Sequence, residues 1–344
     1  MDRRKQLVSI LIPAHNAERW IGTSIQSALG QTWTRKEIIV VDDGSRDGTL
    51  AAAKKFESGE VKVVSIENRG AAAARNHAYS LCQGDYIQWL DADDLLSPDK
   101  VEKQLKALPE EGNGKILLSC PWSPFYHRIQ NSRVVKTSLC ENLSPVEWLL
   151  RKLGQNLHMQ TATWLTNRQL SEIAGPWDTR LLSDDDGEYF CRVLLASEAT
   201  RFVSDVRVYY RVSPSNRLSF IGASDKKKEA LLVSMKLHVK YLLSLENSER
   251  VRKACLTYLQ TWSLMFYPER PDLMAQLQSM ARELGGKLDP PRLRWKYAWM
   301  APIFGWSFAK QAQNVLPQIK ASCSRDLDLM MYRIQAGAGQ QQSR

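Results

Sequence analysis

The sequence lacks the signatures of several large protein classes. Its six cysteines include no C-x-x-C pair and are not accompanied by a cluster of its five histidines, so zinc sites, redox motifs and disulfide frameworks are not indicated. No apolar stretch reaches the roughly 18–20 residues that a membrane-spanning helix needs. The apolar run before Pro13 covers only about six residues, which is too short for a secretory signal. We therefore expect a cytoplasmic protein whose cysteines are reduced.

Two glycine-rich phosphate-binding signatures are also missing. Neither the G-x-G-x-x-G fingerprint of dinucleotide-binding folds nor the P-loop occurs, which weakens both of these interpretations. The net charge of +10 favours an anionic partner, such as nucleic acid, an acidic membrane or a phosphorylated ligand. Because the basic residues are spread along the chain and no nucleic-acid recognition motif accompanies them, we expect no nucleic acid partner.

Apolar segments alternate with helical patterns over the first hundred residues. Apolar strands separated by helices indicate a mostly parallel sheet that is covered on both faces. Ligands bind such sheets beyond the carboxyl ends of the strands, and the polar residues of this region gather at those ends. The expected strands span residues 8–15, 37–45, 61–67 and 85–93, and the helices between them begin near residues 21, 49 and 71.

The chain beyond the fourth strand divides into parts of different character. Ser97 is expected to cap a helix that has Pro98 at its first position and Asp99 near its positive end. The segment 115–215 is irregular, whereas the chain is helical from about residue 225 onward. We expect an α/β domain at 1–222 with halves at 7–110 and 111–222, a helical region at 223–334, and a disordered tail at 335–344.

Three aspartates lie at the end of the fourth expected strand. Asp91 and Asp93 are two positions apart and would project from the same side of an extended backbone, whereas Asp94 would point the other way. Mg²⁺ and Mn²⁺ prefer oxygen ligands and commonly join one or two carboxylates to a diphosphate. A solvated acidic turn is the alternative interpretation, but the position at a strand end favours a metal site.

Three further motifs are suited to chemistry. The carboxylates of VVDDGSRDGT (40–49) suit the edge of a base or sugar, or the motif forms a turn and a helix cap. In NRGAAAARN (68–76), Gly70 leaves room for a ligand and Arg75 suits a phosphate or the acidic cluster; close helix packing is the alternative. In LLSDDDGEYFCRVL (181–194), one aspartate is a candidate general base, or the acids only stabilise a helix N-terminus.

These motifs, in this order and at this spacing, resemble the family 2 glycosyltransferases of the GT-A fold, over about residues 7–220. The resemblance implies an α/β GT-A catalytic domain with a mostly parallel, Rossmann-like sheet flanked by helices, a nucleotide-sugar half at 7–110, an acceptor half at 111–222 and a helical C-terminal extension. His15 stands where the family usually has a tyrosine that stacks on the base. The residues that the resemblance assigns to the nucleotide sugar are Pro13, His15, Asn16, Glu18, Asp42, Asp43, Arg75, Asn76, Asp91 and Ala92.

The resemblance also implies a reaction. Asp186 falls on the catalytic base, and Asp93, with Asp91, on the ligands of Mg²⁺ or Mn²⁺. The implied activity is inverting transfer of a sugar from a nucleotide-diphosphate sugar, foremost a UDP-sugar, to a hydroxyl of a glycan or lipid-linked acceptor during synthesis of cell-surface polysaccharide or glycoconjugate. The residues expected on the acceptor or diphosphate side are Asp185, Arg211, Ser215 and Arg217.

The C-terminal third lies outside the resemblance. Its segment 290–311 combines Trp295, Trp299 and Trp306 with four basic side chains. Such a segment either packs on the catalytic domain or rests on an anionic membrane surface, where tryptophan sits at the headgroup level. The second interpretation would make the protein peripheral at the inner face of the cell membrane.

Two related functions remain as alternatives. A sugar nucleotidyltransferase would share the sheet, but it would need a glycine-rich loop after the first strand, and PAHNAERW contains no glycine. A non-catalytic sugar-nucleotide-binding protein would have no need for both Asp93 and Asp186. We therefore favour glycosyl transfer.

Overall fold

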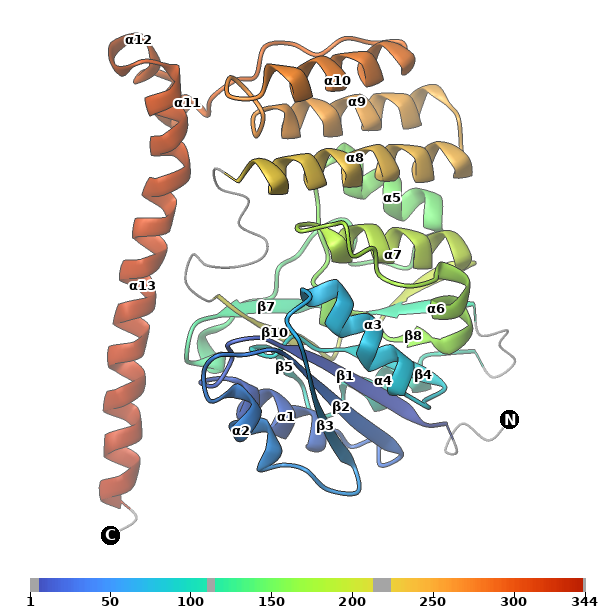
Figure 1. The fold of residues 1–344 in the computed structure, drawn as a ribbon, viewed down its shortest axis with the longest axis vertical. Helices are drawn as coiled ribbons and strands as arrows, with labels where there is room; N and C mark the ends of the chain where they lie inside the picture. The colour runs from blue at the N-terminus through green and yellow to red at the C-terminus, as the bar shows by residue number, and fades with distance from the viewer. Residues whose placement is uncertain (1–5, 110–114, 213–223, 343–344) are drawn as a thin grey trace.

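The computed structural model describes residues 6–109, 115–212 and 224–342, with side chains as far as Gln335. Four of the five strands in its central sheet are parallel and the last is antiparallel. This confirms the mostly parallel sheet expected from the sequence. In spatial order, the sheet consists of β3 (Val61–Ile66), β2 (Lys36–Asp43), β1 (Val8–Ala14), β4 (Tyr86–Trp89) and β8 (Thr166–Asn167) (Figure 1).

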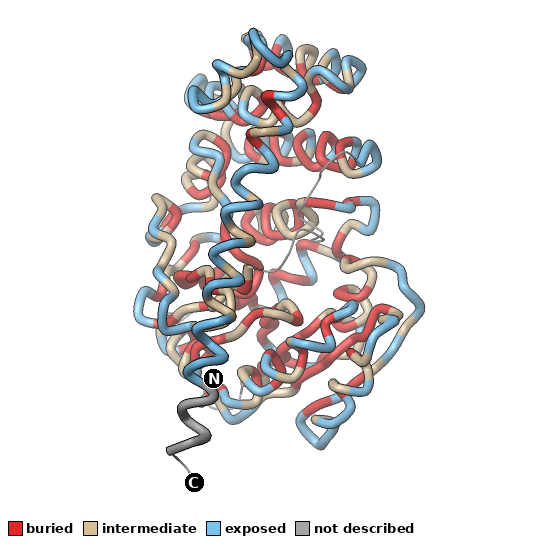
Figure 2. The backbone as a smooth tube through the Cα atoms, turned by 90° about the vertical axis from the view of Figure 1, so that its left-hand side faces the viewer, coloured by how far each residue is buried: buried red, intermediate tan, exposed pale blue. Residues whose placement is uncertain are grey.

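β1, β4 and most of β2 are buried, whereas the edge strand β3 is partly exposed (Figure 2). α1 (Ile21–Leu29) and α2 (Thr49–Lys54) follow β1 and β2, whereas α3 (Ala71–Leu81) packs across the same two strands on its way to β4. Connections between parallel strands are right-handed. Since the chain reverses direction across the sheet after β3, α3 lies on the face opposite α1 and α2. The reversal opens a crevice between β1 and β4, where such sheets bind ligands.

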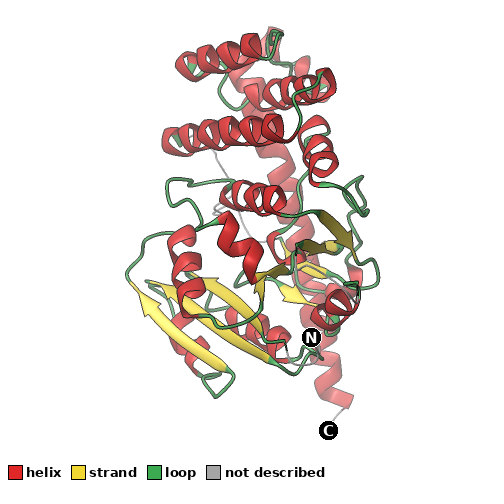
Figure 3. Ribbon diagram, turned by 90° about the vertical axis from the view of Figure 1, so that its right-hand side faces the viewer, coloured by secondary structure: helices red, strands yellow, loops and turns green. Residues whose placement is uncertain are grey.

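The second half of the α/β domain adds two smaller, separate sheets to the central sheet (Figure 3). One of these smaller sheets has three strands and the other has two. The three-stranded sheet contains β5 (Leu95–Leu96), β10 (Val208–Arg211) and β7 (Trp122–Phe125), and the other contains β6 (Ile116–Ser119) and β9 (Ala199–Phe202). The helices of the domain are α4 (Lys100–Lys106), α5 (Pro145–Gly154), α6 (Arg168–Ala174) and α7 (Asp185–Ala196).

The C-terminal region is helical, as expected, and stacks on α5 and α7 (Figure 1). α8 (Asp225–Leu245), α9 (Glu249–Ser263) and α10 (Pro271–Glu283) form this stack. The short helices α11 (Trp295–Ala298) and α12 (Ala301–Phe304) lead into α13 (Trp306–Gln342), which runs back along the side of the α/β domain. Among the described residues, no helix is both long and apolar enough to cross a membrane.

Helix α13 is attached to the α/β domain near its far end. The carboxylate of Asp328 accepts hydrogen bonds from the backbone N–H groups of His127 and Arg128, at 2.9 and 3.2 Å. The Arg128 side chain completes the contact with an ion pair of 2.7 Å to the same carboxylate. The tail predicted to be disordered, 335–344, continues α13 as far as Gln342. The domain boundaries drawn from the sequence stay a prediction.

Two local expectations were wrong. β4 ends at Trp89, and a turn in which the N–H of Asp94 donates to the carbonyl oxygen of Asp91 (3.1 Å) replaces the last part of the expected strand. Asp91 and Asp93 therefore lie in a turn, and the expectation that they share one side of an extended strand does not apply to them. Asp99, not Ser97, occupies the N-cap position of α4, but its side chain does not cap the helix. The side-chain oxygen of Gln31 accepts the N–H of Val101 in the first turn instead. Ser97 instead accepts a hydrogen bond from the N–H of Arg207.

Candidate active site

An acidic cluster lies at the carboxyl end of β4, and Arg75 is at its centre. Arg75 comes from the second turn of α3 and is 6% exposed. Its guanidinium donates to Asp185 at 2.7 Å and to Asp91 at 3.0 Å, and it lies 4.4 Å from the ring centre of Trp177. Burial opposes the charge of Arg75, but Asp185, Asp91 and Asp186 outweigh this effect and raise its pKa. One arginine thus joins acids from the two halves of the domain.

The two acids that bind Arg75, Asp91 and Asp185, have raised pKa values. Burial raises the pKa of Asp91, the Arg75 guanidinium lowers it, and the charges of Asp93 and Asp186 raise it further. The pKa of Asp185 is raised by burial in the same way, again opposed by Arg75. Mutual repulsion of this kind is typical of sites where a cation or a positively charged group completes the charge balance.

Asp186 lies in the first turn of α7 and points toward the same cluster. Thr161, in a short 3-10 turn on the opposite side, donates its hydroxyl to one Asp186 oxygen at 3.0 Å. The Asp186 charge acts on both Arg75 and Asp91, so it lies close to the arginine that organises the cluster. A partly exposed carboxylate with one oxygen held in place suits a proton acceptor.

Asp94 and Arg211 support the turn that carries Asp93. Asp94 is fully buried and accepts hydrogen bonds from Gln160 and from the N–H of Arg211. The Arg211 guanidinium donates to the carbonyl oxygens of Asp93 and Tyr126, both at 2.9 Å. Burial lowers the pKa of Arg211 to about 10. The Asp94 carboxylate is thus bound by Gln160 and the Arg211 backbone, and the Arg211 side chain contacts the backbone of the turn.

The Arg211 guanidinium is also enclosed by aromatic rings. It lies 4.0 Å from the ring centre of Trp20 and 4.4 Å from that of Phe125. Cation–π contacts of this kind are strongest where the cation has lost its water, and Arg211 is only 5% exposed. Arg211, which the sequence places beside the diphosphate, thus packs closely against the turn that carries Asp93.

Several of the residues predicted to bind the nucleotide lie on a rim formed by the loops after β1 and β2. Asp43 is buried, and its two oxygens accept the N–H groups of Arg69 and Gly70 at 2.8 and 2.9 Å. The ring of exposed His15 contacts the Asp43 carbonyl oxygen at 2.8 Å. Asn16 accepts the N–H of Arg46 at 2.9 Å. These bonds tie the loop that follows β1 to the loop that follows β2.

The other predicted nucleotide residues differ in their surroundings. Glu18 accepts the N–H of Gly48, which continues the link between the two loops. Asp42 is buried and accepts the hydroxyl of Ser65 at 3.0 Å. Pro13 is in β1, and the carbonyl oxygen of Ala92 accepts the hydroxyl of Ser24. Ser215 and Arg217 lie outside the described residues.

Asn76 is not brought to this rim. Its amide donates to the carbonyl oxygen of Trp177 at 2.9 Å and accepts the N–H of the same residue at 2.8 Å. Asn76 thereby anchors the segment before α7, and its amide is occupied by backbone. This contact, and those of Gln160, Thr161 and Trp20, could not be found from local patterns. For Gln160 and Thr161 the only signal was their place in the acceptor half, 111–222, that the resemblance implies.

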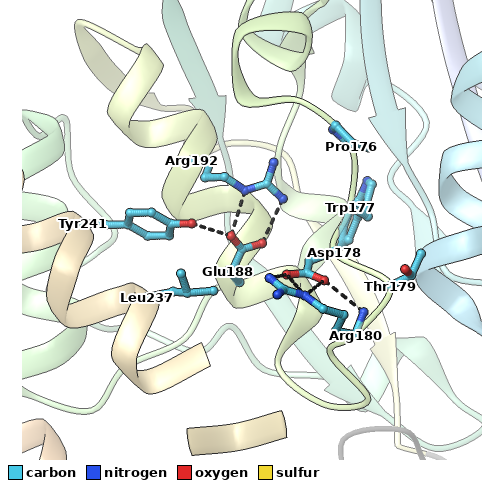
Figure 4. A pocket seen from close by; sticks show the side chains of 9 residues that line it. All are labelled: Pro176, Trp177, Asp178, Thr179, Arg180, Glu188, Arg192, Leu237 and Tyr241. Carbon is cyan, nitrogen blue, oxygen red and sulfur yellow. Dashed lines mark hydrogen bonds and ion pairs between the residues drawn. The ribbon is translucent and has the colours of Figure 1, made fainter. Parts of the chain in front are cut away.

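A cavity of about 460 Å³ lies on the other side of the segment that Asn76 anchors (Figure 4). Glu188 is buried there and accepts two hydrogen bonds from Arg192, both at 2.8 Å, and one from Tyr241 at 2.7 Å. Arg192 therefore serves an internal ion pair. The cavity is lined by Pro176, Trp177, Asp178, Thr179, Arg180, Glu188, Arg192, Leu237 and Tyr241.

Solved structures share this architecture. The structure of S. aureus TarS 1-349 in complex with UDP-GlcNAc matches with a TM-score of 0.64 at 20% sequence identity, over 81% of this chain and 81% of that one. A second structure of TarS 1-349 matches with a TM-score of 0.61, over 81% of this chain and 80% of that one. The fold is of the GT-A type found in glycosyltransferases.

A segment of the chain, residues 9–146, matches the family model described as Glycosyl transferase family 2. It is 44% identical over 102 residues to the chondroitin synthase of Escherichia coli, which is 29% of this chain and 15% of that protein. It is 40% identical over 113 residues to the putative teichuronic acid biosynthesis glycosyltransferase TuaG of Bacillus subtilis. This match covers 32% of this chain and 45% of TuaG. The chain spans less than half the length of these relatives.

Proposed function

We propose that this protein transfers a sugar, with inversion, from a nucleotide-diphosphate sugar to a hydroxyl group of a glycan or lipid-linked acceptor. A UDP-sugar is the proposed donor, and synthesis of cell-surface polysaccharide or glycoconjugate is the proposed setting. The contact of Arg75 with both Asp91 and Asp185 carries this proposal, because it unites the donor-side and acceptor-side acids in one crevice. The names of the relatives, two polymer-building enzymes, support it.

The proposed reaction is a single displacement. Asp186 takes the proton from the acceptor hydroxyl while Thr161 holds one of its oxygens. The acceptor oxygen forms a bond to the anomeric carbon from the face opposite the nucleotide, and the bond from that carbon to the diphosphate oxygen breaks. The electron pair leaves with the nucleoside diphosphate. One base suffices for such an inversion, as in inverting glycoside hydrolysis with a sugar hydroxyl in place of water.

The acids of the 91–94 turn fit a divalent cation that the donor helps to bind. Among the described residues, no group of three or more His, Cys, Asp and Glu side chains could hold a metal ion by itself. Mg²⁺ normally binds one or two carboxylates together with substrate phosphates and water, so Asp93 and Asp91 would suffice in the presence of a diphosphate. A bound Mg²⁺ or Mn²⁺ supplies charge neutralisation for the departing diphosphate.

We also propose that the tip formed by α11 and α12 contacts an anionic membrane. Trp295 is 81% exposed and Trp299 58%, and the basic side chains of Arg292, Arg294 and Lys296 are exposed beside them. Exposed tryptophans next to basic side chains suit the headgroup region of an anionic leaflet. A peripheral position at the inner face of the cell membrane would bring the crevice to a lipid-linked acceptor.

One assay tests the proposed reaction. The protein is incubated with Mn²⁺ and a panel of nucleotide sugars, and released nucleoside diphosphate is measured. Asp186→Asn should abolish release while leaving nucleotide affinity nearly unchanged, because only proton removal is lost. Asp205→Asn, which changes a 60% exposed side chain paired with Lys103, is the matched control. Full activity of Asp186→Asn would overturn the assignment. A nucleotidyltransferase would instead consume added pyrophosphate and convert the nucleotide sugar to a nucleoside triphosphate and a sugar phosphate.

A further inference from the structure

The residue just before the acidic pair of α7 lies in a conformation that L-residues rarely adopt. Asp184 has φ +57° and ψ +27°, the left-handed region. For a residue other than glycine this conformation costs about 1–2 kcal/mol, and it persists where the surroundings hold it. Asp184 therefore needs contacts that outweigh this cost.

Asp184 occupies the N-cap position of α7 but does not cap that helix. Aspartate at an N-cap ordinarily accepts an N–H of its own first turn, and in the described structure no such bond is formed. Its carboxylate turns instead to α8, where the hydroxyl of Ser234 donates to it at 2.9 Å. The preceding residue, Ser183, reaches the start of α8 as well, through the carbonyl oxygen of Lys227 at 3.4 Å. The stabilisation of a helix N-terminus by acids does not account for this arrangement.

The carboxylate of Asp184 also fills the space over the first turn of α7. A Cβ atom at Gly187 would collide with one of its oxygens. On its other side, the buried ring of His238 lies 3.7 Å from Asp184 and 2.9 Å from the Tyr258 hydroxyl of α9. Asp184 is thus held between the first turn of α7 and the helices α8 and α9.

We infer that Asp184 is a positioning residue: through Ser234 it anchors the first turn of α7 to the C-terminal helices and thereby sets the place of Asp186. This inference rests on the proposed function. The two residues that follow Asp184 are directed at the cluster, Asp185 to Arg75 and Asp186 to Thr161. A small misplacement of a reacting group can reduce turnover by about 100-fold. The C-terminal helices are therefore part of the catalytic apparatus in this inference.

Two substitutions of Asp184 and one of Ser234 separate the role of the Asp184 backbone from that of its carboxylate. Asparagine tolerates the left-handed region and can accept the Ser234 hydroxyl, so Asp184→Asn should keep kcat within about twofold. Asp184→Gly relieves the backbone but removes the acceptor, and it should lower kcat about tenfold with the donor KM unchanged. Ser234→Ala should match Asp184→Gly. The control is Ser244→Ala on the same helix, whose hydroxyl bonds only within α8.

Hydrogen exchange of the α7 amides provides a readout that does not depend on activity. Exchange of the first turn should speed up in Asp184→Gly and Ser234→Ala and stay unchanged in Asp184→Asn and Ser244→Ala. Equal exchange in all four variants would overturn the positioning role, whether or not the wild type releases nucleotide. If Asp184→Gly turned over as fast as Asp184→Asn, the carboxylate would have no such role. The wild type could release no nucleotide from any donor while the four variants still show the expected exchange pattern. That result would contradict only the proposed reaction.

Discussion

Arg75 and Asp185 are 110 residues apart in the chain, and their side chains form an ion pair of 2.7 Å. The same guanidinium binds Asp91, which lies in the turn after β4. Both acids are largely removed from water, so neither is easily tolerated without its partner. The relative position of the donor-side and acceptor-side halves therefore depends on one arginine.

Replacing Arg75 should harm both stability and activity. Arg75→Met keeps an apolar chain of similar length but leaves two carboxylates without a counter-charge, so the free energy of unfolding should fall by about 3–5 kcal/mol. Nucleotide release should be lost as well. Urea unfolding measures the first effect. The control Arg180→Met removes a 76% exposed side chain, and equal stability of the two variants would show that Arg75 does not hold the cluster together.

Nucleotide release should depend on a divalent cation. EDTA should abolish it, and added Mn²⁺ or Mg²⁺ should restore it, because the donor diphosphate and the acids of the 91–94 turn are expected to share the ion. Asp93→Asn should weaken binding of UDP in the presence of Mn²⁺, as measured by calorimetry, much more than binding in its absence. Asp205→Asn again serves as the control. Release that continues at full rate in EDTA would contradict the proposed metal site.

Membrane association should require the exposed tryptophans of the α11–α12 tip. The wild type should sediment with vesicles of phosphatidylglycerol and phosphatidylcholine, and the double variant Trp295→Ala, Trp299→Ala should remain in the supernatant. Trp306 is left in place because its ring packs edge-on against Tyr267 at 4.7 Å and supports the fold. Ile173→Ala, which truncates an exposed apolar side chain on α6, is the control. Undiminished sedimentation of the double variant would sink the membrane proposal.

Acid should destabilise the protein through His238. Burial, followed by the charge of Lys152, lowers the pKa of His238 from 6.5 to about 3. Between these two values the unfolded chain binds a proton at His238 and the folded chain does not. The contribution of neutral His238 to the free energy of unfolding is therefore complete above pH 6.5 and is lost as the pH falls toward 3. Between pH 6.5 and 5 the loss should be about 2 kcal/mol.

Urea unfolding at a series of pH values measures this loss. His238→Gln, which cannot be protonated, should show a shallower fall of the unfolding free energy in that range. His77→Gln on α3 is the control. If the unfolding free energy of wild type and of His238→Gln fell equally with pH, the folded protein would bind the His238 proton as readily as the unfolded chain does. The buried position assigned to the His238 ring beside Asp184 and Tyr258 would then need revision.

Much of the donor side was predictable because it depends on local pattern. The apolar runs that became β1, β2 and β3, and the small-residue helix that became α3, keep their positions to within a few residues of expectation. In a parallel sheet the residues after each strand must meet at one edge. The proximity of His15, Asp43 and Asp91 therefore follows from strand order alone.

Side-chain roles were less predictable, because they depend on distant parts of the chain. Asn76 and Arg75 are neighbours in one motif, but only Arg75 faces the acids, whereas Asn76 binds the backbone of Trp177. Arg211 was expected near the diphosphate, and its side chain contacts the backbone of Asp93. In both cases the partner is about a hundred or more residues away, beyond the reach of any local pattern.

The sequence by itself determined the alternation of strands and helices, the edge where the acids gather and the residue types available for chemistry. These features follow from hydrophobic periodicity and from the geometry of parallel sheets. Only the tertiary structure decided that one arginine joins the acids of both halves, and that Asp184 turns from its own helix to Ser234 on α8. Such pairings arise when buried charges and hydrogen-bonding groups find partners during packing.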